Sequence, residues 1–409
     1  MYRKTKRTIA ISSVAILILG AAAILKANFG GEATACACGP GGGPGPALPW
    51  SVAEPVTYQN LTIFPVVSSQ NSDTSDFETL DQALSDGDAV ISEQGGYMRR
   101  TRDGAPVPIY TGGSQVNQLV LLNRGKRPLL LLAGEVVSGG KQDRIIGKDR
   151  IVPIGAEPLP LDVFCVEHGR WTGASMQFSA AETMVHPTVR EQAAVKQDQV
   201  QVWAAVRDET PKVGETNESV TVEAQTGTVQ DLPLTGRNLS ASTAVPAPAA
   251  LPESTIGGVV QGAPTQSYRR IYQSPMVQSS VEGFADEMGR RFDRATSGIK
   301  GGHVVGVVVA FGNEVAWGDI FASPQLFDTY WPKLLRSYVV EALTRPSLRE
   351  TATLDDARDF LRPATGRIEE ETEPGVYTWR RQSVDGLTDI ELEALAPKPI
   401  KLHWLRVAR

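Results

Sequence analysis

The residue types that build metal centres and disulfide frameworks are scarce in this chain. Its 409 residues include only four histidines and three cysteines, which excludes a histidine-rich metal protein and a disulfide-rich scaffold. Aromatic residues make up 7% and hydrophobic residues 41%, which excludes a wholly disordered chain. The formal net charge of -6 leaves no overall basic footprint for nucleic acid. We therefore expect no metal and no nucleic-acid partner.

An uncharged apolar stretch near the N-terminus predicts the cellular location of the protein. Residues 8–25 follow a basic flank, residues 1–7, and approach the length of ~20 residues that crosses a bilayer as a helix. Positive residues favour the cytoplasmic side, so we expect a transmembrane anchor in the bacterial inner membrane with the globular part outside the cytoplasm. A cleaved signal ending near Ala33-Thr34-Ala35 and a lipoprotein at Cys36 are the alternatives. All three export the globular part.

Residues 26–57 are rich in glycine and proline and are typical of a tether. They contain Cys36 and Cys38, whose spacing differs from the two-residue spacing usual in structural zinc sites. No second cysteine pair follows. The simplest interpretation is an exposed thiol pair.

The globular sequence is divided by a segment of different composition. Residues 58–203 and 268–409 carry the aromatic residues, whereas residues 204–267 contain no Phe, Trp or Tyr. We interpret this segment as a flexible, low-complexity insert. Within it, residues 217–243 resemble a short plug-entry segment of TonB-dependent outer-membrane receptors, which implies a docking strand for a protein partner.

The globular parts predict an α+β fold with largely antiparallel sheets and flanking helices, because strands cluster apart from helices instead of alternating with them. Helices are expected after a capping box at Ser75–Glu78, from Pro187, around residues 281–292, from Ser323-Pro324 and over 354–361. Pro332 should kink the fourth helix or start a new one. Strands are expected at residues 61–67, 119–122, 129–137, 151–154, 161–166, 304–311, 315–321, 376–380, 387–392 and 402–407.

Two local expectations are more specific. Residues 123–126 form a hairpin-like turn that should pair the strand at 119–122 with the run at 129–137. The helix from Pro187 should place its apolar side chains on one side. These are Val189, Ala193, Val200 and Trp203.

A basic, glycine-containing segment is the first candidate site. Lys141, Arg144, Lys148 and Arg150 lie close together beside Gly139-Gly140, which suits an anion such as a phosphate or diphosphate. A solvated basic hairpin is the alternative interpretation. The same segment fails the pattern of a phosphate loop, and no dinucleotide fingerprint occurs, so we expect no cofactor.

Residues 161–166 are apolar on both faces, which suggests a central strand that ends at a carboxylate. Alternation places Cys165 and Glu167 on one face and Phe164 and His168 on the other, which argues against a Cys–His nucleophile pair. Glu167 beside buried surface is a candidate acid or base. The remaining histidines have no ligand-spaced partners and are expected to be structural. They are His186, His303 and His403.

These segments together resemble an uncharacterised bacterial family, the ADP-ribosylglycohydrolase- and rhodanese-phosphatase-associated protein domain. The resemblance rests on Gly134-Glu135, on Gly140 to Arg144, on Cys165 to Trp171, and downstream on Asp319 to Phe321 and Trp331 to Leu335. It covers about residues 58–202 and 268–409. It implies a link to ADP-ribose or NAD-derived metabolites and no established activity.

Two hypotheses follow. In the first, the domain binds or processes an anionic, nucleotide- or ADP-ribose-like small molecule. Glu135 and Glu167 would then act as acid and base, and Lys141, Gln142 and Arg144 would hold the ligand. In the second, the protein is a non-catalytic envelope interaction module. A deep polar pocket that unites these residues would favour the first hypothesis, and a flat surface the second.

Overall fold

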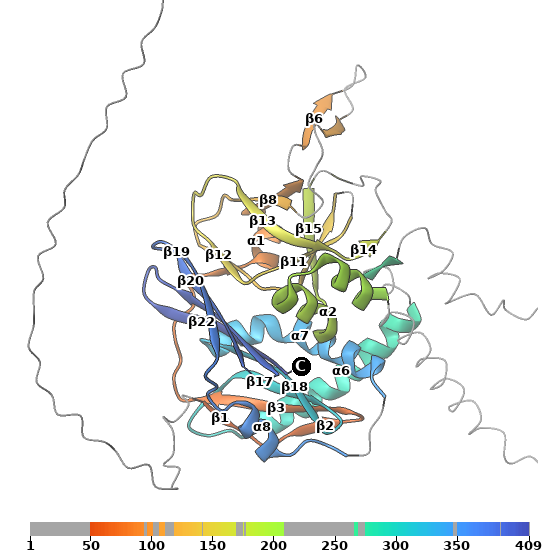
Figure 1. Ribbon diagram of the computed structural model, residues 1–409, viewed down its shortest axis with the longest axis vertical. Coiled ribbons are helices and arrows are strands. Elements are labelled where there is room, and N and C mark those ends of the chain that lie inside the picture. The colour runs from red at the N-terminus through yellow and green to blue at the C-terminus, as the bar shows by residue number, and fades with distance from the viewer. Residues whose placement is uncertain are drawn as a thin grey trace, which may run out of the picture. The chain divides into compact units, whose positions relative to one another are not determined.

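A nine-stranded antiparallel sheet organises the computed structural model (Figure 1). The structure describes residues 50–93, 96–100, 106–110, 118–140, 142–168, 175, 177–207, 266–268, 275–346, 350–384 and 386–408, which all belong to the unit Leu48–Arg409. In spatial order the sheet contains β1 (Trp50–Val52), β3 (Leu61–Ser68), β17 (His303–Phe311), β18 (Glu314–Phe321), β22 (Ile400–Ala408), β21 (Leu387–Ala394), β20 (Tyr377–Val384) and β19 (Arg367–Glu373), and β2 (Val56–Tyr58) also pairs with β3.

The centre of this sheet joins sequence from both sides of the expected insert. β3 pairs along its length with β17, and every residue of β3 is buried. β17 and β18 form a hairpin across Gly312, whose φ of 62° suits a tight turn. The expected strands at 61–67, 304–311 and 315–321 are therefore confirmed.

A closed barrel of six antiparallel strands forms the second part of the fold. Around the barrel these are β10 (Glu135–Gly139), β11 (Arg144–Ile146), β13 (Leu159–Cys165), β8 (Gln118–Asn123), β5 (Ala89–Glu93) and β15 (Gln177–Met184). β13 lies between β11 and β8, as the apolar run at 161–166 predicts. A small three-stranded sheet contains β12 (Arg150–Val152), β9 (Leu129–Leu131) and β4 (Glu78–Thr79). Two further pairs are β14 (Glu167–His168) with β16 (Gln266–Ser267), and β6 (Gly96–Arg100) with β7 (Pro106–Tyr110).

Helix α7 (Pro324–Thr344) lies between the sheet and the barrel, where it contacts both β17 and β15 (Figure 1). α6 (Pro275–Thr296) packs beside it, and their apolar faces meet the sheet face that carries Ile63, Val307 and Val309. Side chains alternate along a strand, so the other sheet face is covered separately. There, α8 (Leu354–Phe360) packs Ala357 and Phe360 onto the sheet.

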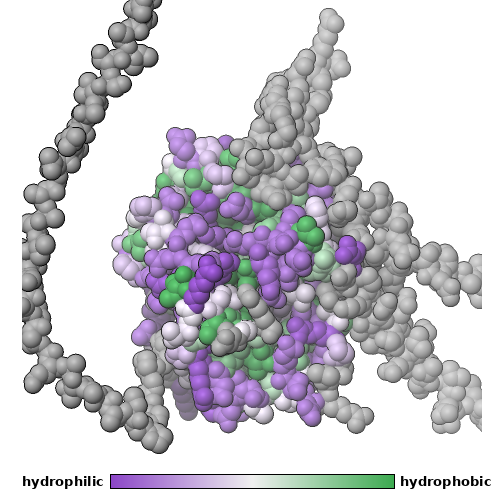
Figure 2. Space-filling view, in the orientation of Figure 1, coloured by the Kyte–Doolittle hydropathy of each residue, from purple (hydrophilic) through white to green (hydrophobic). Residues whose placement is uncertain are grey.

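The fold is mixed α+β with antiparallel sheets, as expected from the sequence. Among the described residues, no helix has the length and apolar character needed to cross a membrane. The expected basic flank, the apolar stretch at 8–25, most of the tether and residues 208–265 lie outside the described part of the chain. Hydrophilic residues predominate in the coloured part of the face in Figure 2, and the large exposed hydrophobic residues of the described surface are Ile154, Val200 and Ile368.

The first helix begins later than the sequence suggested. α1 (Leu80–Asp86) is capped by Thr79, whose hydroxyl accepts from Gln82 N while the Gln82 side chain accepts from Thr79 N. The capping box at Ser75–Glu78 is therefore wrong, and Glu78 instead belongs to β4. Two overlapping Ser/Thr-to-Glu/Gln spacings occur here, and only the second precedes the helix. Gly87 ends α1 in the left-handed conformation.

The expected hairpin between 119–122 and 129–137 is also wrong. β8 pairs with β5 and β13, whereas β9 pairs with β12 and β4. The Asn123 amide turns the chain by donating to the carbonyls of Arg127 and Val152. Gly134, with φ 94°, then separates β9 from β10, and a Cβ at this position would lie 2.8 Å from Arg190 Cγ.

Two helical expectations also change. After α2 (Pro187–Glu191), a π-helical turn (Gln192–Lys196) ends at Gln197 in the left-handed conformation, so Val200 is exposed and does not share the buried side of Val189. α7 continues through Pro332 as one helix, with no new start. Tertiary packing on both sides of α7 outweighs the hydrogen bond that proline removes.

Candidate functional site

Glu135, a predicted catalytic residue, is held in a buried ion pair. It begins β10 and is 1% exposed. One carboxylate oxygen accepts from Leu132 N at 2.6 Å and the other from Lys333 Nζ at 2.5 Å. Lys333 also donates to Asp81 of α1 at 2.6 Å. Burial raises the pKa of the Glu135 carboxyl, although Lys333 opposes this rise.

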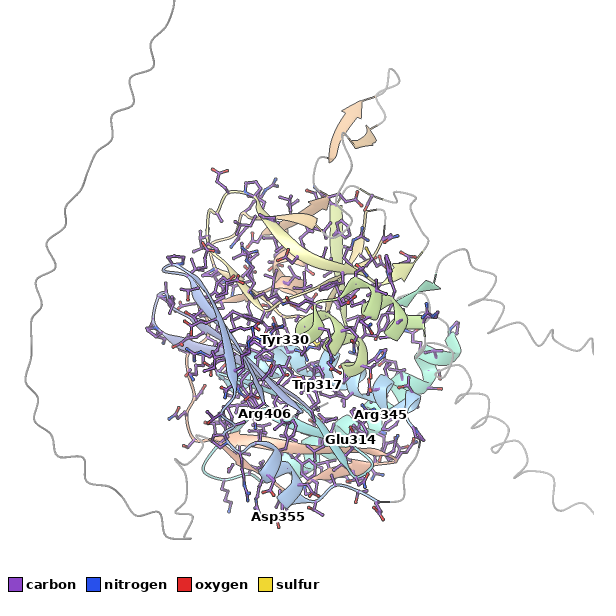
Figure 3. The ribbon with its side chains drawn as sticks, in the orientation of Figure 1. Glu314, Trp317, Tyr330, Arg345, Asp355 and Arg406 are labelled. Carbon is purple, nitrogen blue, oxygen red and sulfur yellow. The ribbon has the colours of Figure 1, made fainter. Side chains whose placement is uncertain are left out.

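Lys333 belongs to a polar stripe on α7. Ser337 and Glu341 follow at four-residue spacing, so the three side chains lie on one face of the helix. Glu341 accepts from Thr188 N at 2.9 Å and from Thr188 Oγ1 at 2.6 Å, and Arg345 donates to it. Arg345 also pairs with Glu314 of β18 at 3.1 Å (Figure 3). The stripe thus fastens α7 to α1, β10 and α2.

Asp319 of β18 is the centre of a second buried network. Its carboxylate accepts from Trp317 Nε1 at 2.7 Å and Tyr338 OH at 2.5 Å, and it pairs with Arg190 and His403, each at 2.9 Å. Burial raises the pKa of the Asp319 carboxyl, but Arg190 and His403 outweigh burial and hold that pKa well below its ordinary value. Asp319 is therefore ionised.

His403 lies between two carboxylates. Nε2 lies 2.9 Å from Asp319 Oδ1, and Nδ1 lies 2.6 Å from Asp149 Oδ2. Carboxylates on both sides of the ring favour the imidazolium form, in which both ring nitrogens donate hydrogen bonds. Burial lowers the pKa of His403, but the two carboxylates, Asp149 foremost, raise it above its ordinary value.

The network joins the sheet to the barrel side of the molecule. Asp149 also accepts from Ala133 N at 2.7 Å, and Arg190 Nε donates to Ala133 O at 2.8 Å. Two cations and two anions thus balance in a region where Asp149, Arg190, Asp319 and His403 are each at most 1% exposed. These buried groups satisfy one another, so the network serves as a structural joint between the sheet and the barrel side of the molecule.

The other predicted site residues form a separate group at the end of β11 and β13. Arg144 pairs in register with Cys165, and Arg144 Nη1 donates to Gln142 Oε1 at 3.3 Å. The Glu167 carboxylate accepts from Asp143 N at 3.3 Å. The structure thus brings Gln142, Arg144 and Glu167 together, whereas the carboxylate of Glu135 binds Lys333. Lys141 lies outside the described residues.

The charges around Arg144 bear on the predicted anion site. Burial lowers the pKa of the Arg144 guanidinium, while Cys165, Glu93, Asp143 and Glu167 act in the opposite direction. Three of these groups are carboxylates, so the described surroundings are already rich in negative charge. Anion binding by Gln142 and Arg144, and acid–base roles for Glu135 and Glu167, remain predictions. Burial raises the pKa of the Cys165 thiol to about 11, as expected of a packing cysteine.

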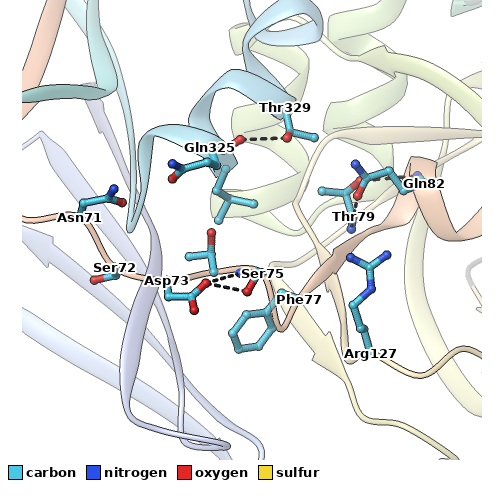
Figure 4. Close-up of a pocket in the computed structure, with 12 residues that line it drawn as sticks. Asn71, Ser72, Asp73, Ser75, Phe77, Thr79, Gln82, Arg127, Gln325 and Thr329 are labelled. Atoms are coloured by element: carbon cyan, nitrogen blue, oxygen red, sulfur yellow. Dashed lines mark hydrogen bonds between the residues drawn. The ribbon is translucent and has the colours of Figure 1, made fainter.

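A polar cavity of about 490 Å³ lies beside the start of α7 (Figure 4). It is lined by Asn71, Ser72, Asp73, Thr74, Ser75, Phe77, Thr79, Gln82, Arg127, Gln325, Leu326 and Thr329. Thr74 and Ser323 hydroxyls meet at 2.6 Å, and the Ser323 hydroxyl also caps α7 by accepting from Leu326 N. These bonds fix the chain segment 71–79 against the first turn of α7.

Two charged groups define the cavity wall. Asp73 accepts from Ser75 N at 3.0 Å and Ser75 Oγ at 2.6 Å, and these bonds lower its pKa. Arg127 Nη2 lies 2.9 Å from Glu78 Oε1. The Arg127 side chain is 45% exposed and that of Glu78 is 1% exposed, so the guanidinium reaches from a buried partner toward the cavity.

Sequence reasoning did not identify this cavity. The polar run from Asn71 to Ser75 is the signal that the sequence offers, and of this run only Ser75 belongs to the expected capping box. Gln325 and Thr329 lie some 250 positions further along the chain, as the 249-residue separation of Thr74 and Ser323 illustrates. Lys333 and Glu341 were detectable as charges at helical spacing in an otherwise apolar segment.

The fold and these sites define a mixed α+β domain in which a barrel and a sheet share one central helix and a buried charged joint. A family model, the ARG and Rhodanese-Phosphatase-superfamily-associated Protein domain, matches residues 50–404. The chain therefore belongs to this family, as its motifs suggested. The comparison with curated proteins and the comparison with solved structures each gave no match.

Replacing Asp319 tests the joint. In Asp319→Asn, Arg190 and His403 lose their shared counter-charge in a buried region, and we expect the free energy of unfolding to fall by about 3–5 kcal/mol. Asp355→Asn is the matched control, because Asp355 forms an exposed pair with Arg358 on α8 and should change stability by at most about 0.5 kcal/mol. Urea denaturation of both variants measures the difference. A loss below about 1 kcal/mol for Asp319→Asn would contradict the structural role.

Proposed function

We propose that this domain binds an anionic small molecule of nucleotide or sugar-phosphate size in the polar cavity beside α7. The observation that carries the proposal is the cavity itself, whose lining combines hydroxyl and amide side chains with the guanidinium of Arg127. Its volume of about 490 Å³ lies within the range of roughly 300–1,000 Å³ usual for ligand pockets.

The charges in the cavity support an anion. The guanidinium of Arg127 pairs with the buried Glu78 through Nη2, and because its side chain is 45% exposed, its remaining N–H groups can donate to a phosphate or carboxylate. The first turn of α7, with Gln325 and Leu326 in the lining, adds the positive end of a 21-residue helix. Asp73 opposes an anion, but its carboxylate is turned to the Ser75 N–H and hydroxyl.

The lining also favours a ligand with several hydroxyl groups. Thr79, Gln82, Gln325 and Thr329 offer donors and acceptors around the cavity, which suits the ribose or sugar part of such a molecule. The family's association with ARG, which the sequence resemblance identifies with ADP-ribosylglycohydrolase, makes ADP-ribose-like molecules the first probes.

The proposal concerns binding and includes no chemical step. Glu135 and Glu167 are each 1% exposed, and the Glu135 carboxylate is occupied by Lys333 and Leu132. The interaction-module hypothesis remains the alternative, with residues 217–243 as the docking segment outside the described part of the chain.

Binding is tested by a thermal-shift titration of the protein with ADP-ribose, nucleotides and sugar phosphates. A ligand at 100 times its dissociation constant should stabilise the protein by about 2.7 kcal/mol. Arg127→Gln should weaken that ligand at least tenfold, and Thr329→Val, which keeps all charges, should weaken it less. Arg124→Gln, an exposed change in the same loop, should have no effect. Equal weakening by Arg124→Gln, or no stabilisation by any anion, would contradict the proposal.

We also propose that the domain is exported and anchored by residues 8–25 at the bacterial inner membrane. The basic flank and the length of this apolar stretch support the topology. Carbonate extraction of membranes should leave the chain in the pellet. Release into the soluble fraction with a new N-terminus near Cys36 would instead support a cleaved signal.

A further inference from the structure

An irregularity in β15 places a carboxylate at a second cavity. Ala180 pairs with Val137 and Met184 pairs with Glu135, so three residues of β15 lie opposite the single residue Val136. Glu182, the middle residue of this bulge, has a φ of 51°. Bulges re-aim side chains and are frequent beside functional sites.

The backbone of Glu182 differs in context from the other non-glycine residues of the described chain that have positive φ. Gln59, with φ 53°, lies in the short turn between β2 and β3, and Gln197, with the same φ, ends the π-helical turn. A turn and a helix end each require such a conformation locally. Glu182 lies in a bulge within a strand, where glycine is the residue that takes this conformation without strain, so a glutamate here points to a role for the side chain.

The second cavity has an apolar floor and a polar rim. Its volume is about 360 Å³, and it lies between β15, α6 and α7. The buried side chains of Val136, Met184, Val281 and Val340 form the floor. The rim carries Glu182, Gln278, and the pair of Glu282 and Arg336.

The rim has one uncompensated charge. Arg336 Nε and Nη2 donate to the two oxygens of Glu282 at 2.9 and 3.2 Å, so this pair neutralises itself. Among the described residues, the exposed carboxylate of Glu182 forms no hydrogen bond or ion pair. The cavity therefore offers apolar surface next to a single available negative charge.

We propose that this cavity binds an organic cation that carries an ammonium group on an apolar stem, with Glu182 as its counter-ion. The stem would bury apolar surface against Val136, Met184, Val281 and Val340, and the ammonium would replace water at the Glu182 carboxylate. This site is independent of the anion cavity, because it is lined by different residues and takes a ligand of opposite charge.

Hexylammonium is the probe, and titration calorimetry of the full chain is the measurement. It should bind at least tenfold more tightly than 1-hexanol, which has the same stem without the charge. Glu182→Gln should remove that difference, while Glu157→Gln, an exposed change elsewhere, should preserve it. The proposal is overturned if hexylammonium binds no better than hexanol, or if it binds Glu182→Gln as tightly as the unchanged protein.

The strain at Glu182 is tested by glycine, which adopts positive φ freely. Glu182→Gly should raise the thermal midpoint by about 2 °C and abolish hexylammonium binding. Gln59→Gly is the matched control, because it relaxes a similar φ at a turn and should raise the midpoint without changing binding. A lower midpoint for Glu182→Gly would show that the bulge is not strained, and retained binding would exclude Glu182 as the counter-ion. Either result contradicts the proposal.

Discussion

The fold depends on the buried ionic contacts of Asp319. This carboxylate lies at the centre of the sheet, yet its partners come from α2, α7, β18 and β22. A buried carboxylate is costly unless charges and hydrogen bonds compensate it, and here two cations and two neutral donors do so. The same cation, His403, reaches Asp149 beyond the sheet. The hydrogen bonds and ion pairs that compensate the Asp319 carboxylate therefore hold the sheet against the barrel side of the molecule.

Helix α7 connects the buried charges around Asp319 to both cavities. Tyr338 binds Asp319, while Lys333 and Glu341 bind the barrel side from the polar stripe of the same helix. The start of α7 lines the anion cavity, and its middle lines the cation cavity beside Glu182. Both proposed sites thus use a helix that is held on two sides by buried charges, which keeps their walls preorganised.

The sequence predicted the elements of the fold better than their partners. The two strands of the β17–β18 hairpin were expected at 304–311 and 315–321, and the Ser323-Pro324 cap was sufficient for the start of α7. Pairing depended on side chains far away in sequence, as where Asn123 turned β8 away from β9. For the sites, Gln142, Arg144 and Glu167 lie together, whereas Glu135 binds Lys333 and does not join them. Neither the Glu135–Lys333 pair nor the His403–Asp149 contact could be predicted, because 198 and 254 residues separate the partners and no local pattern links them.

The protonation state of His403 tests the account most directly. Its folded pKa is raised above 6.5, so the stability it contributes should be complete below about pH 6.5 and be lost as the pH rises through the folded pKa. The groups that face the ring are Asp149 and Asp319, with Arg190 and Tyr338 on the far side of Asp319. Nuclear magnetic resonance of ¹⁵N-labelled imidazole rings follows both nitrogens across this range, with Asp149→Asn to assign the signal. The account predicts two protonated nitrogens at pH 6.5 and a titration above that pH. A ring that is neutral at pH 6.5, or that titrates below it, would contradict the charged joint between sheet and barrel.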